Sequence, residues 1–293
     1  MSSPGSTARP DAPAELEFAL PGLTLAARAW GPPEGRPVLA LHGWLDSAAS
    51  FDALAPLLPG LRLVCLDLPG HGRSGHRHAT AGYDFVHWLP DALAAADALG
   101  WRRFAVLGHS LGASIGLCLA GLAPERVERA LLIDGLGPLV APAEDAPGRI
   151  AAAIAARQRL AGRTATTYAS LDEAVAHKHR ALPGLSLEAA RTLTLRGIAP
   201  GDDGRLAWRH DPRLRGPSLL RLTEEQVRAF LRRVACPVLV VRPRDGWPVE
   251  QAEVRRRLDC LGDVALIEVE GGHHVHLDHP GRIAARALAF LGA

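Results

Sequence analysis

Hydrophobic and polar positions follow two rhythms along the chain. Short apolar runs bounded by Gly and Pro predict strands, and stretches with apolar positions at helical spacing lie between them. The predicted strands are Glu15–Leu20, Leu23–Trp30, Val38–Leu41, Leu61–Leu68, Phe104–Leu107, Val127–Ile133, Pro237–Arg242 and Val264–Val269. Helices are predicted over residues 47–58, 85–99, 111–122, 249–261 and 280–291. This alternation predicts βαβ units in an α/β fold, a doubly wound and mostly parallel sheet.

The alternation stops between residues 136 and 233. Four helical patterns occur there, separated by Pro and Gly and without a clear strand pattern, at 148–162, 170–181, 186–197 and 223–233. A helical insertion at this point of the chain is expected to lie over the carboxyl edge of the sheet, where α/β proteins hold their sites. The sequence therefore predicts a core of residues 15–135 and 234–293, an inserted helical cap of residues 136–233, and a flexible N-terminal tail of residues 1–14.

Composition excludes several classes of partner. The chain has 293 residues, 48% of them hydrophobic, which is enough for one large core. Its net charge is only +2, with both signs spread along the chain, so neither nucleic acid nor a membrane is an expected partner. We expect a cytoplasmic protein, since no secretory signal or membrane-spanning run is evident. The cysteines lack C-x-x-C spacing and are expected to be reduced thiols: Cys65, Cys118, Cys236 and Cys260.

A serine lies at the sharpest break in this pattern. The strand predicted at 104–107 runs into Gly108-His109-Ser110-Leu111-Gly112, which matches G-x-S-x-G, and a helical pattern follows. The glycines permit a tight turn that exposes the serine oxygen above the sheet, and the helix start supplies free N–H groups. A second match centred on Ser114 overlaps the first. Ser110 directly follows the strand and Ser114 lies one helical turn further on, so Ser110 is the predicted nucleophile.

A nucleophilic serine needs a base, and position narrows the choice among the 13 histidines to one segment. The segment 271–280 follows the last predicted strand and carries four of them. His273, which lies next to a pair of glycines, is the first candidate base, and His274 and His276 are the alternatives. With Asp278 these residues are possible metal ligands, but their spacing matches no helical ligand pair such as H-E-x-x-H. We therefore predict neither a metal nor a cofactor.

These segments resemble a known superfamily. The chain from residue 15 onward is similar to α/β-hydrolase fold proteins in the order and spacing of His42-Gly43-Trp44, Asp67–Ser74, Gly108–Gly112 and Gly272-His273. Within that superfamily, the segments Leu41–Asp52 and Leu131–Gly135 most resemble serine hydrolase-like proteins and their bacterial relatives, whose substrates are poorly defined. In such proteins the last loop commonly runs Gly-His, four residues, an acidic residue, any residue and Pro. His273, Asp278 and Pro280 fit that frame, and the resemblance therefore implies His273 as the base.

The resemblance implies an acid between the serine and the histidine in chain order. Two carboxylates directly follow apolar runs in that interval, Asp134 and Asp245. We favour Asp245 and keep Asp134 as the alternative, because some hydrolases place their acid after the earlier strand. The family usually has Gly two residues before its acid, where this chain has Pro243.

The expected oxyanion hole consists of two backbone N–H groups, those of Trp44 and Leu111. The main hypothesis is a cofactor-free serine hydrolase that acts on an ester or related acyl compound. Trp208 and many Leu and Ala residues in the cap suggest a small-molecule substrate with an apolar acyl or alcohol part. The alternatives are a C–C bond hydrolase or a perhydrolase of the same fold, and a non-catalytic ligand-binding protein. The sequence does not indicate an oligomeric state.

Overall fold

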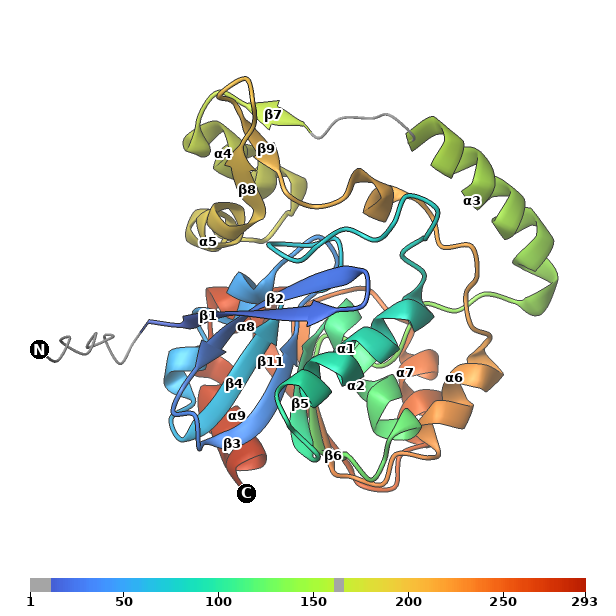
Figure 1. The fold of residues 1–293 in the computed structure, drawn as a ribbon. Coiled ribbons are helices and arrows are strands. Elements are labelled where there is room, and N and C mark those ends of the chain that lie inside the picture. The colour runs from blue at the N-terminus through green and yellow to red at the C-terminus, as the bar shows by residue number, and fades with distance from the viewer. Residues whose placement is uncertain (1–11, 161–165) are drawn as a thin grey trace, which may run out of the picture.

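Helices cover both faces of a central sheet in the computed structural model of this chain, which describes residues 12–160 and 166–293 (Figure 1). The eight strands lie in the order β1-β2-β4-β3-β5-β6-β10-β11. Strands β3 to β11 of this sheet pair in parallel, and β2 is antiparallel to both β1 and β4. The predicted fold class, a doubly wound and mostly parallel sheet, is confirmed. The strands are β1 (Ala14–Leu20), β2 (Leu23–Trp30), β3 (Arg36–Leu41), β4 (Leu61–Leu66), β5 (Phe104–His109), β6 (Val127–Ile133), β10 (Val238–Asp245) and β11 (Val264–Gly272).

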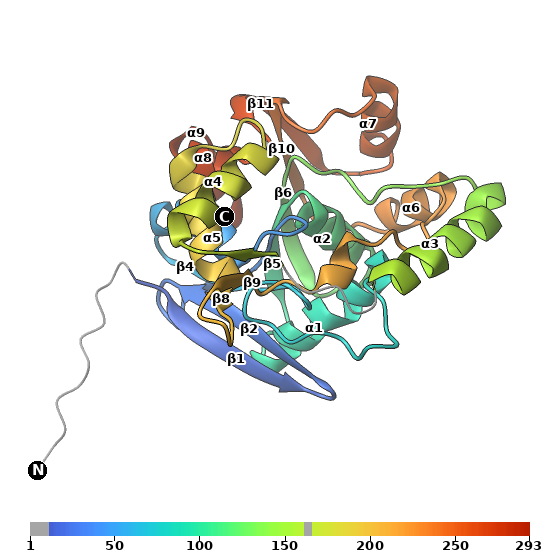
Figure 2. The ribbon, with the colours of Figure 1, turned by 90° about the horizontal axis from the view of Figure 1, so that it is seen from above.

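The helices divide between the two faces of this sheet, as the view from above shows (Figure 2). Helices α1 and α2 pack on one face, and α9 lies on the other. The helices other than α3, α4 and α5 are α1 (Trp88–Ala98), α2 (Leu111–Leu122), α6 (Glu224–Leu231), α7 (Gln251–Leu258), α8 (Val275–Asp278) and α9 (Gly281–Gly292). Apart from the short α8, all of them were predicted, and the bounds of α2 and β6 match the prediction. In the described ranges, no helix combines the length and the apolar character needed to cross a membrane.

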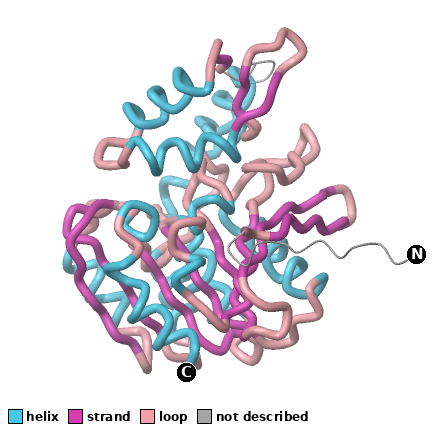
Figure 3. Tube along the Cα trace, turned by 90° about the vertical axis from the view of Figure 1, so that its left-hand side faces the viewer, coloured by secondary structure: helices cyan, strands magenta, loops and turns pink. Residues whose placement is uncertain are grey.

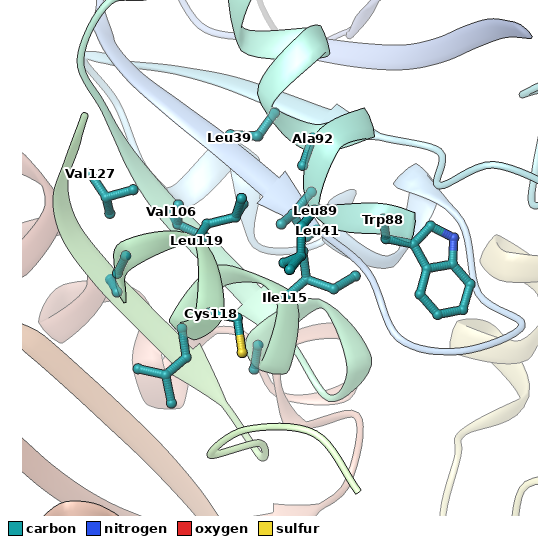
Figure 4. Close-up of a cluster of buried hydrophobic side chains, with 14 of the residues drawn as sticks. Leu39, Leu41, Trp88, Leu89, Ala92, Val106, Ile115, Cys118, Leu119 and Val127 are labelled. Atoms are coloured by element: carbon teal, nitrogen blue, oxygen red, sulfur yellow. The ribbon is translucent and has the colours of Figure 1, made fainter. Parts of the chain in front are cut away.

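The larger hydrophobic cluster lies between the sheet and the helices α1 and α2 (Figure 4). Leu39 and Val106 come from neighbouring parallel strands, Leu89 comes from α1, and Ile115 and Leu119 come from α2. Strands in the middle of the sheet are apolar on both faces because a second cluster fills the opposite side against α9. The core thus fixes the strand ends on which a site can be built.

One predicted segment differs from the structure, and two lie partly outside the described residues. Residues 47–58 form two short 3₁₀ turns, Ala48–Phe51 and Ala55–Leu57, in place of a regular helix. The predicted tail, 1–14, falls outside the described residues up to residue 11, and Ala14 already begins β1. Residues 161 and 162, at the end of the helix predicted over 148–162, are outside as well.

The inserted region is not purely helical, which corrects the prediction for residues 136–233. Besides α3 (Ala146–Leu160), α4 (Leu171–Ala181) and α5 (Leu187–Gly197), it contains a small antiparallel sheet of β7 (Thr167–Tyr168), β8 (Ile198–Pro200) and β9 (Leu206–Trp208). Strands this short carry too few residues to show an alternating pattern. Together with α4 and α5, the small sheet lies above the main sheet (Figures 1 and 3). Helix α6 instead packs on α2 of the core. The division into core and cap stays a prediction.

A buried arginine ties α5 to the core. The Arg196 side chain is fully buried, and its Nε donates to both carboxylate oxygens of Asp67, at 2.9 and 3.1 Å. Its Nη1 donates to Glu15 on β1, at 2.8 and 2.9 Å. Asp67 follows β4 and also accepts the backbone N–H groups of Ala48 and Arg73. The carboxylate and the guanidinium therefore satisfy each other in a site without water contact.

We expect Arg196→Ala to lower the free energy of unfolding by about 3–5 kcal/mol, because it leaves the Asp67 carboxylate buried without its cation. Arg191→Ala on the same helix is the matched control, since Arg191 pairs with Asp172 at the exposed surface. That variant should change stability by less than about 1 kcal/mol. Urea unfolding measures both, and equal midpoints for the two variants would show that the buried pair is not what holds α5 in place.

Candidate active site

Ser110 occupies a sharp turn between β5 and α2. The turn is tight because two glycines permit close backbone approach. A Cβ on Gly108 would lie 2.5 Å from the backbone nitrogen of Ala113, and one on Gly112 would lie 1.9 Å from the carbonyl oxygen of Leu41. Ser114 lies inside α2, where its hydroxyl donates to the carbonyl of Ser110 at 3.3 Å. Ser114 is therefore committed to its own helix, and Ser110 is the serine at the turn.

Backbone strain gathers at this edge of the sheet. Three residues other than glycine have positive φ angles in the described chain: Leu45 at 60°, Ser110 at 53° and Asp134 at 49°. They follow β3, β5 and β6, which are parallel neighbours or next neighbours in the sheet, so they lie at one edge. Each such conformation costs about 1–3 kcal/mol and persists where surrounding contacts enforce it. Strain of this kind is typical of functional sites.

His273 follows β11 and pairs with a carboxylate. Its Nδ1 lies 2.5 Å from Oδ2 of Asp134, so the ring donates Nδ1–H to the carboxylate. The same oxygen of Asp134 accepts the backbone N–H of Trp247 at 2.7 Å. The Asp134 side chain is nearly buried, and its backbone is fixed by a hydrogen bond to Val241 of β10. The carboxylate thus holds one tautomer of the ring and leaves Nε2 free for another partner.

The favoured acid, Asp245, does not meet His273 in this structure. Asp245 is exposed at the end of β10, and the alternative carboxylate, Asp134, takes the place beside the histidine. The pairing of β10 with β11 shifts its register between Pro243 and Asp245. Pro243 has no N–H to donate to the ladder, and a bulge redirects the side chains after it. The β10 loop therefore brings the N–H of Trp247 to the site, and Asp134, the alternative acid, occupies the position beside His273 that was expected for Asp245.

A second histidine joins the serine turn to the histidine loop. His109 is fully buried beside Ser110, and its Nε2 donates to the backbone carbonyl of His273 at 2.9 Å. Burial lowers the pKa of His109 well below its usual value, and the nearby histidines lower it further, so the ring is neutral. In the described part of the chain, the Ser110 hydroxyl makes no hydrogen bond with His273. Hydrogen bonds between catalytic residues are often long or poorly aligned when no substrate is bound. The missing hydrogen bond is therefore compatible with a joint role for Ser110 and His273.

The two expected oxyanion donors follow β3 and β5, which are neighbouring parallel strands. Leu111 is the first residue of α2, so its N–H points out of the helix, and Trp44 follows β3. Among the residues described, neither N–H has an acceptor. The Trp44 indole donates to the carbonyl of Leu214 at 3.2 Å, and half of its side chain is exposed.

His42, two residues before Trp44, joins the loops after β3 and β4. Burial lowers the pKa of His42 to about 4, and the neutral ring accepts the N–H of Leu68.

A buried polar cluster lies next to the pair formed by His273 and Asp134. Asp46, His109 and His274 bring possible ligand atoms within 4.8 Å of one another, which suits a divalent cation. The Lys178 ammonium, however, already lies 3.2 Å from Asp46. A cation of the protein thus sits on the only carboxylate of the cluster, and a metal ion there would be repelled by it. The residues fit a hydrogen-bonded network better than a metal centre.

The fold and the sequence together define the class of protein. The sequence profile of the alpha/beta hydrolase fold family matches residues 36–280, and the chain belongs to that family. It is 31% identical over 290 residues to a serine hydrolase-like protein of Dictyostelium discoideum, spanning 92% of this chain and 79% of that one. A crystal structure of a hypothetical protein from Pseudomonas aeruginosa shares 44% identity with a TM-score of 0.87, over 95% of this chain and 97% of that one. The expected resemblance to serine hydrolase-like proteins is thereby confirmed.

One further solved structure shows how widely the fold is used. A thioesterase domain from the curacin biosynthetic pathway aligns with a TM-score of 0.84 over 95% of this chain and 99% of that one, at 23% identity. At that identity the likeness concerns the fold alone.

The sequence interpretation missed most of the polar network behind the site. Asp46, Lys178 and His109 had no assigned role, and His274 was considered only as an alternative base. His274 instead donates from Nε2 to Asp46 at 3.0 Å. One signal was present in the sequence, because Lys178 is the only lysine of the chain. In a chain whose other basic residues are all arginine, this single lysine could have been singled out as a candidate for a specific role.

The buried histidines predict a loss of stability in mild acid. Burial, together with neighbouring histidine charges, lowers the pKa of His109 and His276 well below 6.5, and the pKa of His71 falls to about 3. The unfolded chain takes up protons on these residues near pH 6.5, whereas the folded chain does not. The free energy of unfolding should therefore decrease as the pH falls from 6.5 to 5, by up to about 1.4 kcal/mol per pH unit for each such histidine.

His276→Gln tests this directly, because the amide can still meet the Ser50 hydroxyl that lies 2.8 Å from His276 Nε2. We expect a shallower pH dependence of stability in that variant between pH 6.5 and 5. His279→Gln, at an exposed position of the same segment, should retain the slope of the wild type. Thermal denaturation across this pH range measures all three proteins, and identical slopes would contradict the account.

Proposed function

We propose that the protein is a cofactor-free serine hydrolase in which Ser110, His273 and Asp134 form the catalytic triad. The observation that carries this proposal is the 2.5 Å hydrogen bond from His273 Nδ1 to Asp134, at the sheet edge where Ser110 lies in a strained turn. The three residues follow β11, β6 and β5. Serine, acid and histidine occur in the chain order of α/β-hydrolases. The serine hydrolase-like name of the Dictyostelium relative agrees with this reading.

The proposed reaction proceeds through an acyl-enzyme. His273 Nε2 takes the proton of Ser110 while the serine oxygen attacks the substrate carbonyl. Asp134 holds the Nδ1–H tautomer and stabilises the imidazolium that forms. The N–H groups of Trp44 and Leu111 receive the negative charge that develops on the carbonyl oxygen. His273 then protonates the leaving group as its bond to the acyl carbon breaks. In the second half of the reaction His273 takes a proton from water, the water oxygen attacks the acyl carbon, and the proton passes to Ser110 as the acid is released.

The proposed substrate is a small ester or related acyl compound with an apolar part. Two tryptophans next to the site support this, because 50% of Trp44 and 54% of Trp247 is exposed. The Trp247 ring lies 5.7 Å from the ring of His273. Large apolar side chains left exposed beside a nucleophile offer contact area to an acyl or alcohol group.

The expected cytoplasmic location stays a prediction, and the four unpaired cysteines fit a reducing compartment.

We expect a fluorophosphonate probe to label the wild type stoichiometrically and to leave Ser110→Ala unlabelled, because only an activated serine attacks the phosphorus. Hydrolysis of p-nitrophenyl esters should fall by a factor of about 10³ or more in this variant. Ser114→Ala is the matched control, since Ser114 is buried in α2 and should leave both readouts within about twofold. An unlabelled wild type would favour a non-catalytic ligand-binding protein.

Substitution of the two candidate acids should have very different effects on kcat. Asp134→Asn keeps the shape of the side chain but allows the wrong tautomer of His273, so we expect kcat to fall by about 10³- to 10⁴-fold. Asp245→Asn should change kcat by less than about threefold, because that carboxylate faces solvent. Steady-state hydrolysis of the best p-nitrophenyl ester provides the comparison. An equal or larger loss of kcat in Asp245→Asn would identify Asp245, at the end of β10, as the acid of the triad.

A further inference from the structure

The Lys178 ammonium joins the inserted region to the loop after β3. Lys178 lies on α4, and only 10% of its side chain is exposed. Its Nζ donates to the carbonyl oxygen of Leu45 at 3.0 Å and to Oδ1 of Asp46 at 3.2 Å. Both acceptors belong to the turn that also carries Trp44. The ammonium therefore forms its hydrogen bonds within the protein, which argues against a role in binding a ligand.

This turn, residues 43–46, is short and strained. The N–H of Asp46 donates to the carbonyl of Gly43 at 3.1 Å, which closes a four-residue turn with Trp44 and Leu45 at its centre. Leu45 has a φ of 60°, a conformation that a leucine keeps only when neighbouring contacts enforce it. Lys178 supplies such a contact, because it binds the carbonyl of the strained residue. The orientation of the Trp44 N–H depends on the same turn.

Asp46 extends the connection to the catalytic histidine loop. Its Oδ2 accepts Nε2–H of His274 at 3.0 Å, and His274 is the neighbour of His273. Burial alone would raise the pKa of Asp46, but the charges of His274 and Lys178 outweigh burial and hold that pKa well below its usual value. Asp46 is thus ionised, and the Lys178 ammonium binds one of its two carboxylate oxygens. Helix α4, the turn of residues 43–46 and the His273 loop form one hydrogen-bonded unit.

We propose that Lys178 is a positioning residue that aligns the Trp44 N–H of the oxyanion hole, so that α4 must be seated on the core before the transition state is stabilised. This inference rests on the proposed serine hydrolase function and adds a residue to it. Lys178 acts through Leu45 and Asp46 and touches no reacting atom. An oxyanion donor acts on the charge that develops during attack, so its misalignment reduces kcat much more than the binding of a neutral ester.

Two other roles for Lys178 make different predictions. A residue that binds an anionic group of the substrate would affect KM, and only with charged substrates. A residue that merely stabilises the fold would affect the melting temperature and leave kcat of the folded enzyme unchanged. Neutral esters and a separate measure of the tetrahedral state therefore distinguish the three roles.

The test compares Lys178→Met, which keeps an unbranched apolar stem and removes the ammonium, with Arg180→Met. Arg180 is exposed on the same helix and serves as the matched control. Both variants and the wild type are assayed with neutral p-nitrophenyl esters and with phenylboronic acid. The boronic acid forms a tetrahedral adduct with a catalytic serine and places an oxygen in the oxyanion hole. Lys178→Gln, which keeps an uncharged N–H donor group, is the second variant if Lys178→Met does not fold.

We expect kcat of Lys178→Met to fall by about 10- to 100-fold with KM changed by less than about threefold. The inhibition constant for phenylboronic acid should rise in proportion. Lys178→Gln should lie between this variant and the wild type, and Arg180→Met should match the wild type.

A lower melting temperature with unchanged kcat and unchanged boronic acid affinity, in either Lys178 variant, would overturn the positioning role. A rise in KM alone would overturn it too. Fluorophosphonate labelling separates the two levels of the argument. No labelling of the wild type would reject the proposed hydrolase, whereas equal labelling rates for wild type and Lys178→Met would reject only the role of Lys178.

Discussion

The close approach of α2 to β3 is the constraint on which the rest of the site depends. At Gly112 the helix backbone touches the carbonyl of Leu41, and a single added carbon would lie 1.9 Å from that oxygen. Because the contact is backbone to backbone, no flexible side chain can yield to relieve a clash. It sets the start of α2 beside the loop after β3, so that the serine, the helix N–H groups and the turn of residues 43–46 converge. The remaining polar groups are arranged around this contact.

Two buried cations connect the inserted region to the core in the same way. Arg196 on α5 binds Asp67 after β4, and Lys178 on α4 binds Asp46 after β3. Both carboxylates lie just past strand ends of the parallel sheet, and both also fix backbone or side-chain groups of the loops around them. A buried carboxylate needs a cation, and here that cation comes from the other part of the molecule. The position of α4 and α5 is therefore coupled to the shape of the loops beneath them.

Strain and neutral histidines both concentrate beneath the candidate site. Leu45, Ser110 and Asp134 hold unfavourable backbone angles, while His109 and His276 are buried without charge. Each of these features lowers stability relative to a relaxed, apolar alternative. The two hydrophobic clusters on either side of the sheet offset them and keep the strand ends fixed. Because the core is stable, the fold can retain strained backbone angles and buried polar groups at the edge of the sheet where the candidate site lies.

The sequence by itself predicted the strands of the main sheet, most of the helices, and two members of the proposed triad. Helix α2 and strand β6 were predicted to the residue, and Ser110 was located from the strand that precedes it, because periodicity and glycine breaks are local properties. The preceding strand located the histidine loop, and the resemblance to the hydrolase family selected His273 within it. The tertiary structure decided the partners. Asp134 meets His273 across 139 residues, and Asp245 turns away because the ladder shifts after Pro243, which no local pattern reveals. Lys178 and Asp46 are likewise 132 residues apart. Which polar groups pair depends on how distant strand ends and helices come together, and that is set by packing of the whole chain.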